Sequence, residues 1–196
     1  DGLRAWQHHG AVVVHDAHAS GATSALLLER CRPGTPLGLA VAEPEQDVVI
    51  AGLLSRLWSA PAEGFAFRSL QVMCDTWTAE FHQRLARSPS HLDPGLVEAG
   101  MELWRELPGT AKRTALLATD LHAGNVLASQ REPWLVIDPK PYLGDPAYDV
   151  LQHMLNCDRL TTEPRRLADR MAKLLELDPE RVTQWLFARC VYESPD

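Results

Sequence analysis

Apolar residues recur at helical spacing over most of this chain. Leu70, Met73, Trp77, Phe81 and Leu85 stand three or four positions apart, so a helix places them on one face. Other stretches with this spacing follow a proline, which favours the first turn of a helix. They begin near residues 44, 94, 146, 164 and 179. The pattern predicts a mainly helical chain whose apolar stripes form the core.

Short apolar runs bounded by turn residues predict a few strands. Two of them lie before Pro33, at residues 12–15 and 26–28. Two more, at residues 126–128 and 134–137, are separated by a polar turn, which is typical of a β-hairpin. The sequence therefore predicts an α+β fold with a helical lobe, an embedded hairpin and part of a sheet near the N-terminus.

Acidic and amide side chains stand at the ends of the predicted hairpin. Asp120 and Asn125 precede its first strand and Asp138 follows its second, so the hairpin brings Asn125 and Asp138 together. Each residue alone is explained by a turn or a helix cap. Together, a carboxylate that accepts a hydroxyl proton and two oxygen ligands for Mg²⁺ are typical of phosphoryl transfer from ATP. We expect Asp120 to be the base and Asn125 and Asp138 the metal ligands.

The segment around Asp138 carries a family resemblance. Residues 136–149 read Val-Ile-Asp-Pro-Lys-Pro-Tyr-Leu-Gly-Asp-Pro-Ala-Tyr-Asp, which resembles aminoglycoside phosphotransferases of the streptomycin 6-kinase and hydroxyurea kinase branch. Protein kinases would have Phe-Gly after the aspartate, so Pro139-Lys140 argues against a protein substrate. Residues 25–37 resemble the strand and hinge that join the two lobes of these kinases, and residues 185–190 resemble their last helix, so the resemblance covers nearly the whole chain.

The resemblance implies a protein-kinase-like fold with ATP and Mg²⁺ as cofactors. Residues 1–30 would be the remnant of the N-terminal lobe, 31–37 the hinge and 38–196 the C-terminal lobe with the catalytic site. The main chain of Glu29 and Cys31 would hold adenine. The family's phosphate-covering loop and its lysine should precede the hinge, and neither is visible. We therefore expect the C-terminal part of a longer protein, or a sequence without the start of that lobe.

Three further residues near the predicted site have two interpretations each. His122 is placed to contribute a hydrogen bond or positive charge near the transferring phosphate, or to cap a backbone group. Asp149 would meet a cationic group of the substrate, or complement a helix dipole at the surface. Asp145 precedes a proline, so we interpret it as a helix cap that is mainly structural.

Composition narrows the possible partners and location. The 196 residues are 45% hydrophobic and carry a net charge of −7 with a pI near 5.6. A net negative charge disfavours binding to nucleic acid and suits a cationic small molecule. No apolar run approaches the length of a membrane span, and the four cysteines form no Cys-x-x-Cys pair, so we expect a cytoplasmic protein with reduced thiols. Histidines 8, 9, 15 and 18 are read as solvated rather than metal-binding.

We expect an ATP-dependent phosphotransferase that acts on a hydroxyl of a small cationic molecule, with streptomycin as the first candidate and antibiotic resistance as its role. Two alternatives stay open. One is a metabolic kinase with another acceptor, and the other is a non-catalytic nucleotide-binding module or fragment. The oligomeric state is left open by the sequence.

Overall fold

The computed structural model describes residues 1–88 and 91–194 as helices and short strands. The helices are α1 Gly2–Trp6, α2 Leu37–Ala40, α3 Glu43–Trp58, α4 Leu70–Arg87, α5 Pro94–Glu106, η1 Leu107–Thr110, η2 Ala123–Asn125, α6 Pro146–Asp149, α7 Leu151–Leu155, α8 Arg159–Thr162, α9 Pro164–Leu174 and α10 Pro179–Glu193. The strands are β1 Val14–Ser20, β2 Thr23–Leu28, β3 Ala115–Leu117, β4 Val126–Ala128, β5 Trp134–Val136 and β6 Tyr142–Gly144. The predicted mixture of helices and small sheets is confirmed.

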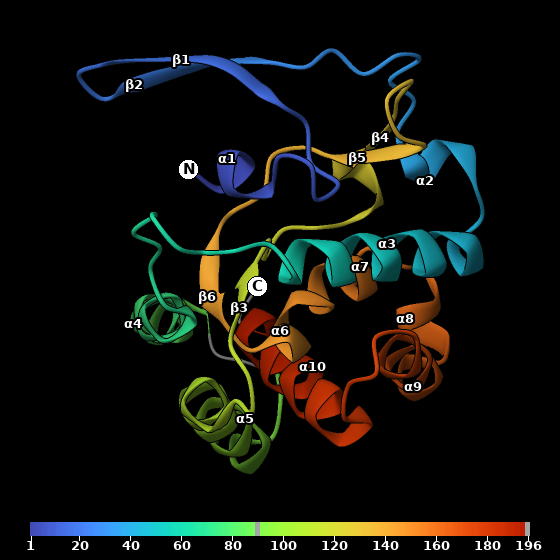
Figure 1. The fold of residues 1–196 in the computed structure, drawn as a ribbon. Coiled ribbons are helices and arrows are strands. Elements are labelled where there is room, and N and C mark those ends of the chain that lie inside the picture. The colour runs from blue at the N-terminus through green and yellow to red at the C-terminus, as the bar shows by residue number, and fades with distance from the viewer. Residues whose placement is uncertain (89–90, 195–196) are drawn as a thin grey trace.

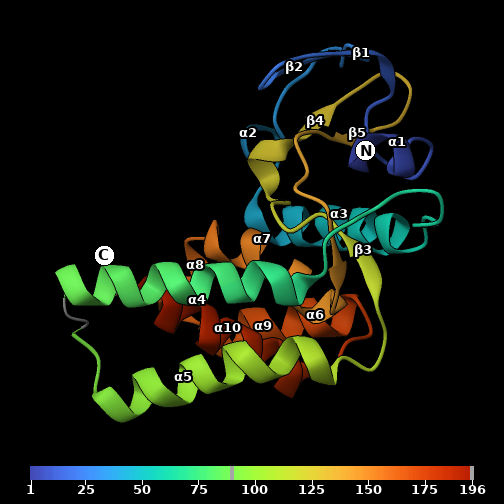
Figure 2. The ribbon, with the colours of Figure 1, turned by 90° about the vertical axis from the view of Figure 1, so that its left-hand side faces the viewer.

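The molecule consists of a helical body with a smaller, strand-containing part above it (Figure 1). Helix α10 packs against α5, α9 and α6 within the body. Figure 2 shows α4 and α5 side by side at one edge of this body, with α3 running between it and the smaller part. Buried Trp104 and Trp185 meet edge to face at 5.8 Å between ring centroids. The apolar stripes predicted from the sequence therefore do form the core.

Aspartate caps explain why several helices begin where the sequence predicts. Asp93, Asp145 and Asp178 each precede a proline at the first helical position. Each carboxylate accepts a hydrogen bond from the amide two residues later, at 2.8, 3.0 and 3.1 Å respectively. The cap satisfies a backbone amide that would otherwise lack a partner inside the helix.

Among residues 1–88 and 91–194 the structure has three antiparallel strand pairs, namely β1–β2, β3–β6 and β4–β5. The pairing of Val126 with Val136 and of Ala128 with Trp134 confirms the predicted hairpin. The first strand differs from its prediction, since it begins at Val14 and runs to Ser20. Val12 instead donates its amide to the carbonyl of Val136 at 3.1 Å. Helix α1 and strands β3 and β6 were not predicted, because elements of three to five residues are too short to show a periodic pattern.

Loop segments on both sides hold the β4–β5 hairpin. Val136 donates to the carbonyl of Gly10 at 2.8 Å, and Ala128 donates to the carbonyl of Thr35 at 2.9 Å. Segments that precede α2 in the chain therefore continue the hydrogen bonding of both hairpin strands. The position of the hairpin relative to residues 10–12 and 34–36 is fixed by backbone groups.

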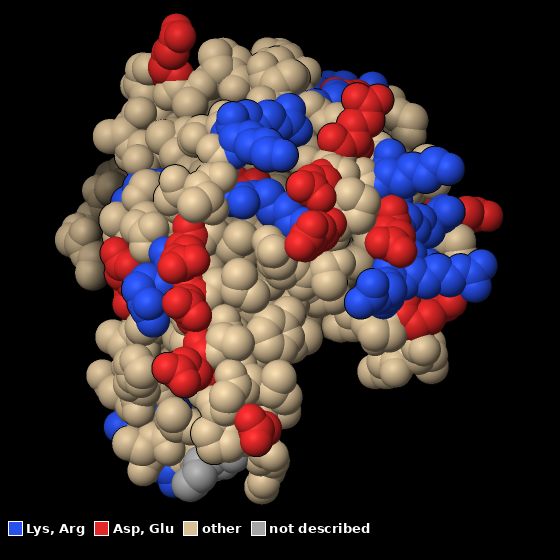
Figure 3. All heavy atoms as spheres, turned by 90° about the horizontal axis from the view of Figure 1, so that it is seen from below, with Lys and Arg blue, Asp and Glu red and all other residues tan. Residues whose placement is uncertain are grey.

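The underside of the helical body carries acidic and basic side chains intermixed, as Figure 3 shows. Along the parts of the chain that the structure describes, no helix combines the length and the apolar character needed to cross a membrane.

Candidate active site

The loop after β3 places Asp120 at the wall of a pocket. Thr119 has a φ of +52°, a left-handed conformation that costs free energy for a residue with a branched side chain. The Thr119 hydroxyl donates to the carbonyl of Lys140 at 2.5 Å. The backbone just before Asp120 is thus held in an unusual conformation by the segment that follows Asp138.

Asp149 braces the same loop from inside the protein. Its carboxylate accepts hydrogen bonds from the amides of Ala118 at 3.0 Å and Thr119 at 2.6 Å, and from the indole of Trp58 at 2.9 Å. Burial raises the pKa of Asp149 to about 6, while the three donors act in the opposite direction. The side chain supports the loop that presents Asp120.

The prediction that Asp149 meets the substrate is corrected by this geometry. The residue is 1% exposed, and both carboxylate oxygens already accept hydrogen bonds from the protein. The sequence pattern put it in a first helical turn, where acids are common at surfaces. Burial against the loop after β3 could not be read from that pattern.

Asn125 lies five residues after Asp120 and is bonded back to it. Its side-chain Nδ2 donates to the backbone carbonyl of Asp120 at 3.0 Å. This leaves the amide oxygen as the free end of the side chain. Ile137 donates its amide to the carbonyl of Asn125 at 2.9 Å, so the next residue, Asp138, stands beside Asn125 as the hairpin prediction requires.

Asp138 offers an exposed carboxylate in a left-handed backbone conformation, with a φ of +48°. With the free amide oxygen of Asn125 it forms a donor set made of oxygen atoms alone. Hard divalent cations such as Mg²⁺ prefer oxygen ligands of this kind, so the residues fit the predicted ion. The carboxylate also pairs with the Lys140 ammonium at 2.7 Å.

His122 caps the short helix η2. Its Nδ1 accepts a hydrogen bond from the amide of Gly124 at 3.2 Å, which is the capping role considered for it. A neutral ring then carries its proton on Nε2. That second nitrogen is the part of His122 available to donate to a ligand.

Two separate pockets include residues of the loop and of the hairpin region. One, of about 560 Å³, contains Asp120, and the other, of about 490 Å³, contains Asp138. The second is also lined by Glu29 and Cys31, with apolar walls from β2, β4 and Ile137. The residues predicted to hold adenine therefore lie in the same pocket as a predicted metal ligand.

Glu29 anchors the predicted hinge to the turn of the hairpin. Its carboxylate accepts hydrogen bonds from the Arg131 guanidinium at 2.9 and 2.8 Å and from the Val13 amide at 3.1 Å. The bond from Arg131 is the main cause of the lowered pKa of Glu29. The Glu29 amide donates to the carbonyl of Val13 at 2.8 Å, so a ligand at the Glu29 backbone would have to bind its carbonyl. Sequence reasoning missed Arg131, which looked like an ordinary polar turn residue.

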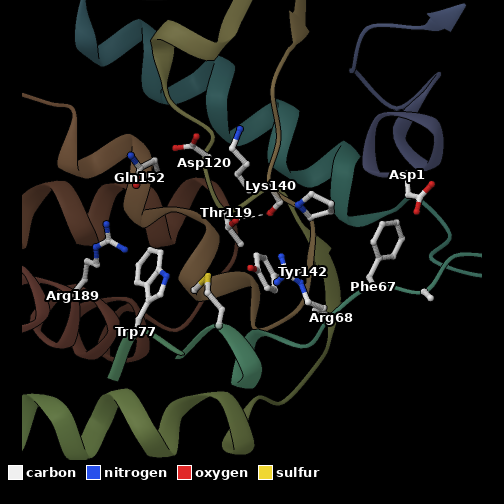
Figure 4. Close-up of a pocket in the computed structure, with 13 residues that line it drawn as sticks. Asp1, Phe67, Arg68, Trp77, Thr119, Asp120, Lys140, Tyr142, Gln152 and Arg189 are labelled. Atoms are coloured by element: carbon white, nitrogen blue, oxygen red, sulfur yellow. Dashed lines mark hydrogen bonds between the residues drawn. The ribbon is translucent and has the colours of Figure 1, made fainter. Parts of the chain in front are cut away.

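The pocket around Asp120 combines aromatic and basic side chains (Figure 4). The Arg68 guanidinium lies over the ring of Tyr142, 4.9 Å from its centroid. Arg189 lies over the ring of Trp77 at 4.5 Å. Neither arginine was recognised from the sequence, because isolated arginines on helices and loops give no distinctive signal.

Comparison with known proteins places this arrangement among small-molecule kinases. Residues 1–194 match the family model described as aminoglycoside/hydroxyurea antibiotic resistance kinase. The chain is 33% identical to a streptomycin 6-kinase of Streptomyces glaucescens over 98% of this chain and 64% of the relative. It is 36% identical to a hydroxyurea phosphotransferase of Kitasatospora aureofaciens over 99% of this chain and 57% of the relative. The chain thus spans about six tenths of the length of the curated relatives it matches.

Solved structures share the fold at low identity. An aminoglycoside phosphotransferase in a ternary complex with ADP and hygromycin B is 15% identical with a TM-score of 0.62, over 98% of this chain and 74% of that one. A choline/ethanolamine kinase family protein from Mesorhizobium loti is 15% identical with a TM-score of 0.59, over 99% of this chain and 78% of that one. The predicted α+β, protein-kinase-like fold is confirmed.

Proposed function

The chain belongs to the aminoglycoside/hydroxyurea antibiotic resistance kinase family, and we propose that its protein transfers the γ-phosphoryl group of ATP to a hydroxyl of a small molecule. One observation supports this above all others. Asp120 lines one pocket and Asp138 lines another, and Asn125 is hydrogen-bonded to the backbone of Asp120 and of Ile137, the residue before Asp138. Each pocket then has its own ligand, with the acceptor beside Asp120 and the nucleotide beside Asp138.

Asp120 acts as the base in this proposal. Its carboxylate orients the acceptor hydroxyl and takes its proton as the new oxygen–phosphorus bond forms. The bond between the γ-phosphorus and the bridging oxygen breaks, and its electron pair stays on ADP. The hydrogen bonds from the backbone of Ala118 and Thr119 to Asp149 hold the loop in place during this step.

The nucleotide is assigned to the pocket of Glu29 and Cys31. Adenine needs an acceptor and a donor on one edge, and the carbonyl of Glu29 and the amide of Cys31 are two residues apart on the same strand-like segment. Asn125 and Asp138 would hold Mg²⁺, which would supply positive charge against the phosphates. Residues 1–30 are proposed to belong to the smaller lobe, residues 31–37 to the hinge, and residues 38–196 to the larger lobe.

An aminoglycoside such as streptomycin is the proposed acceptor, given the curated streptomycin 6-kinase relatives. A second candidate is an uncharged hydroxylated molecule of the hydroxyurea type, given the hydroxyurea phosphotransferase relative. The pocket is lined by Arg68, Lys140 and Arg189 together with Asp1 and Asp120. It carries charges of both signs, so the choice between the two candidates is left to the test.

The test is phosphate transfer by the full-length protein with ATP and Mg²⁺ against streptomycin, other aminoglycosides, hydroxyurea and small amino alcohols. Asp120→Asn keeps the size of the side chain and removes the base, so we expect turnover to fall by about 10²–10⁴-fold. The exposed Asp169→Asn serves as the matched control. Nucleotide binding without transfer to any acceptor would favour a non-catalytic module, and unchanged turnover in Asp120→Asn would refute the mechanism.

A further inference from the structure

Lys140 joins the two halves of the candidate active site. Its backbone amide donates to the carbonyl of Ala118 at 2.8 Å, and its carbonyl accepts from the Thr119 hydroxyl at 2.5 Å. The residue is also flanked by Pro139 and Pro141, which restrict its backbone. Lys140 is therefore fixed directly against the segment that leads into Asp120.

The side chain of Lys140 contacts Asp138, and the residue lines the pocket of Asp120. Its ammonium lies 2.7 Å from Oδ1 of Asp138, and Lys140 lines the same pocket as Asp120. Figure 4 shows the side chains of Asp120 and Lys140 extending to the same side of that pocket. Lys140 thus lines one pocket and pairs with a residue of the other.

The ion pair of Lys140 with Asp138 has little structural value. The two side chains are 51% and 69% exposed, and exposed pairs of this kind add little to folding stability. A lysine held by a rigid backbone, with its ammonium in an open cleft, is instead suited to binding an anion.

The other basic residues nearby are less well placed, within the part of the chain that the structure describes. Arg68 and Arg189 line the same pocket, but each guanidinium lies over an aromatic ring. Arg4 lines a cavity with Asp138 that does not include Asp120. Lys140 alone among them both pairs with Asp138 and lines the pocket of Asp120.

We propose that Lys140 is a catalytic residue whose ammonium binds the non-bridging oxygens of the γ-phosphoryl group as it moves from ADP to the acceptor. The proposal rests on the phosphotransferase function proposed above. The ammonium stays protonated throughout, while the hydroxyl proton goes to Asp120 and the electron pair of the broken bond goes to ADP. Its positive charge stabilises the charge that spreads over the phosphoryl oxygens in the transition state.

The experiment compares wild type, Lys140→Met and Lys140→Arg in the full-length protein. The exposed Lys112→Met is the matched control, since Lys112 is 84% exposed and its nearest acid, Asp178, is 3.9 Å away. Binding of ADP and of the non-hydrolysable ATP analogue AMP-PNP is measured by calorimetry with Mg²⁺ and without acceptor. Turnover is measured with the acceptor found in the preceding test, and thermal unfolding checks that each variant is folded.

If Lys140 contacts the γ-phosphoryl group, Lys140→Met should weaken AMP-PNP binding by about 10-fold and change ADP binding by less than about 2-fold. We expect kcat to fall by about 100-fold with little change in the acceptor KM. Lys140→Arg, which keeps the charge, should recover part of both losses. If Lys140→Met does not fold, the same comparison is made with Lys140→Gln.

Equal weakening of ADP and AMP-PNP, or no weakening of either, would overturn the assignment. The binding comparison needs no acceptor, so it separates this proposal from the proposed function. If Lys140→Met weakens the binding of AMP-PNP but not of ADP, while wild type phosphorylates no acceptor, the contact is supported and the proposed function is contradicted. Wild type that binds neither nucleotide would overturn both.

Discussion

Asp120 and Asp149 are two acids of the same site with opposite environments. Asp120 lines an open pocket, whereas Asp149 is buried and bonded to Ala118, Thr119 and Trp58. Spacing along the chain predicted where Asp120 would lie, because a loop before a hairpin has few possible positions. It could not show that Asp149 faces inward, because that depends on β3 and on a tryptophan 91 residues away in the sequence.

Replacing Asp149 by asparagine should loosen the loop. Asparagine has one acceptor oxygen where the carboxylate has two, so at least one of the buried N–H donors of Trp58, Ala118 and Thr119 loses its partner. We expect the variant to be about 1–3 kcal/mol less stable and its turnover to fall with little change in acceptor KM. Chemical unfolding and steady-state kinetics of the full-length protein measure these changes. The exposed Asp169→Asn should behave as wild type, and an Asp149→Asn protein of unchanged stability and turnover would contradict the bracing role.

Short elements were the least predictable part of the fold. The long helices follow from their apolar stripes, α5 and α10 also follow from their aspartate–proline starts, and the β4–β5 hairpin follows from its turn. Strand β6 gave no such signal, although it pairs with β3 and Leu143 bonds to the carbonyl of Arg68 at 2.8 Å. It is defined by close packing, which a sequence pattern does not reveal.

Gly144 makes that close packing possible. A Cβ atom at Gly144 would clash with the side chain of Leu70, at 2.9 Å from Cδ2. Gly144→Ala should therefore push β6 away from α4 and destabilise the protein by about 1–3 kcal/mol. Thermal unfolding tests this against Gly52→Ala, where nothing lies within 4 Å of the added atom. Gly52→Ala should be more stable than wild type by about 0.5–1 kcal/mol, because alanine favours a helix interior. Equal unfolding temperatures of the two variants would be inconsistent with the close packing of Gly144 against Leu70.

Across the whole molecule, Asp47 connects α3 to the helices that follow the active-site hairpin. Its buried carboxylate is bonded to His153 at 2.9 Å, Arg159 at 2.8 Å and Arg170 at 2.7 Å. Burial alone would raise the pKa of Asp47, but these three partners together hold it well below its usual value. The cluster ties three helices together, since His153 lies in α7, Arg159 in α8 and Arg170 in α9.

Asp47→Asn should lower the free energy of unfolding by about 2–4 kcal/mol at neutral pH, less than for a fully buried pair because both arginines reach solvent. The carboxylate has a lower pKa in the folded protein than in the unfolded chain. The contribution of this charge to the free energy of unfolding is therefore present above about pH 4 and is lost as the pH falls below that value. Urea unfolding of wild type and variant between pH 3 and pH 8 measures the difference. If the difference in the free energy of unfolding between wild type and Asp47→Asn stayed constant down to pH 3, the charge of Asp47 would not be what stabilises the cluster.

The pairing of the hairpin with the first residues of the chain affects the order in which the molecule is assembled. Arg131 donates to the carbonyl of Ala11, and these residues are 120 positions apart in the sequence. The loop that this contact closes contains most of the helical body. Closing so long a loop costs more chain entropy than local helix formation. The hairpin and the segment around Ala11 should therefore pair last, after the helices have formed, and during synthesis that segment must wait unpaired until the hairpin has left the ribosome.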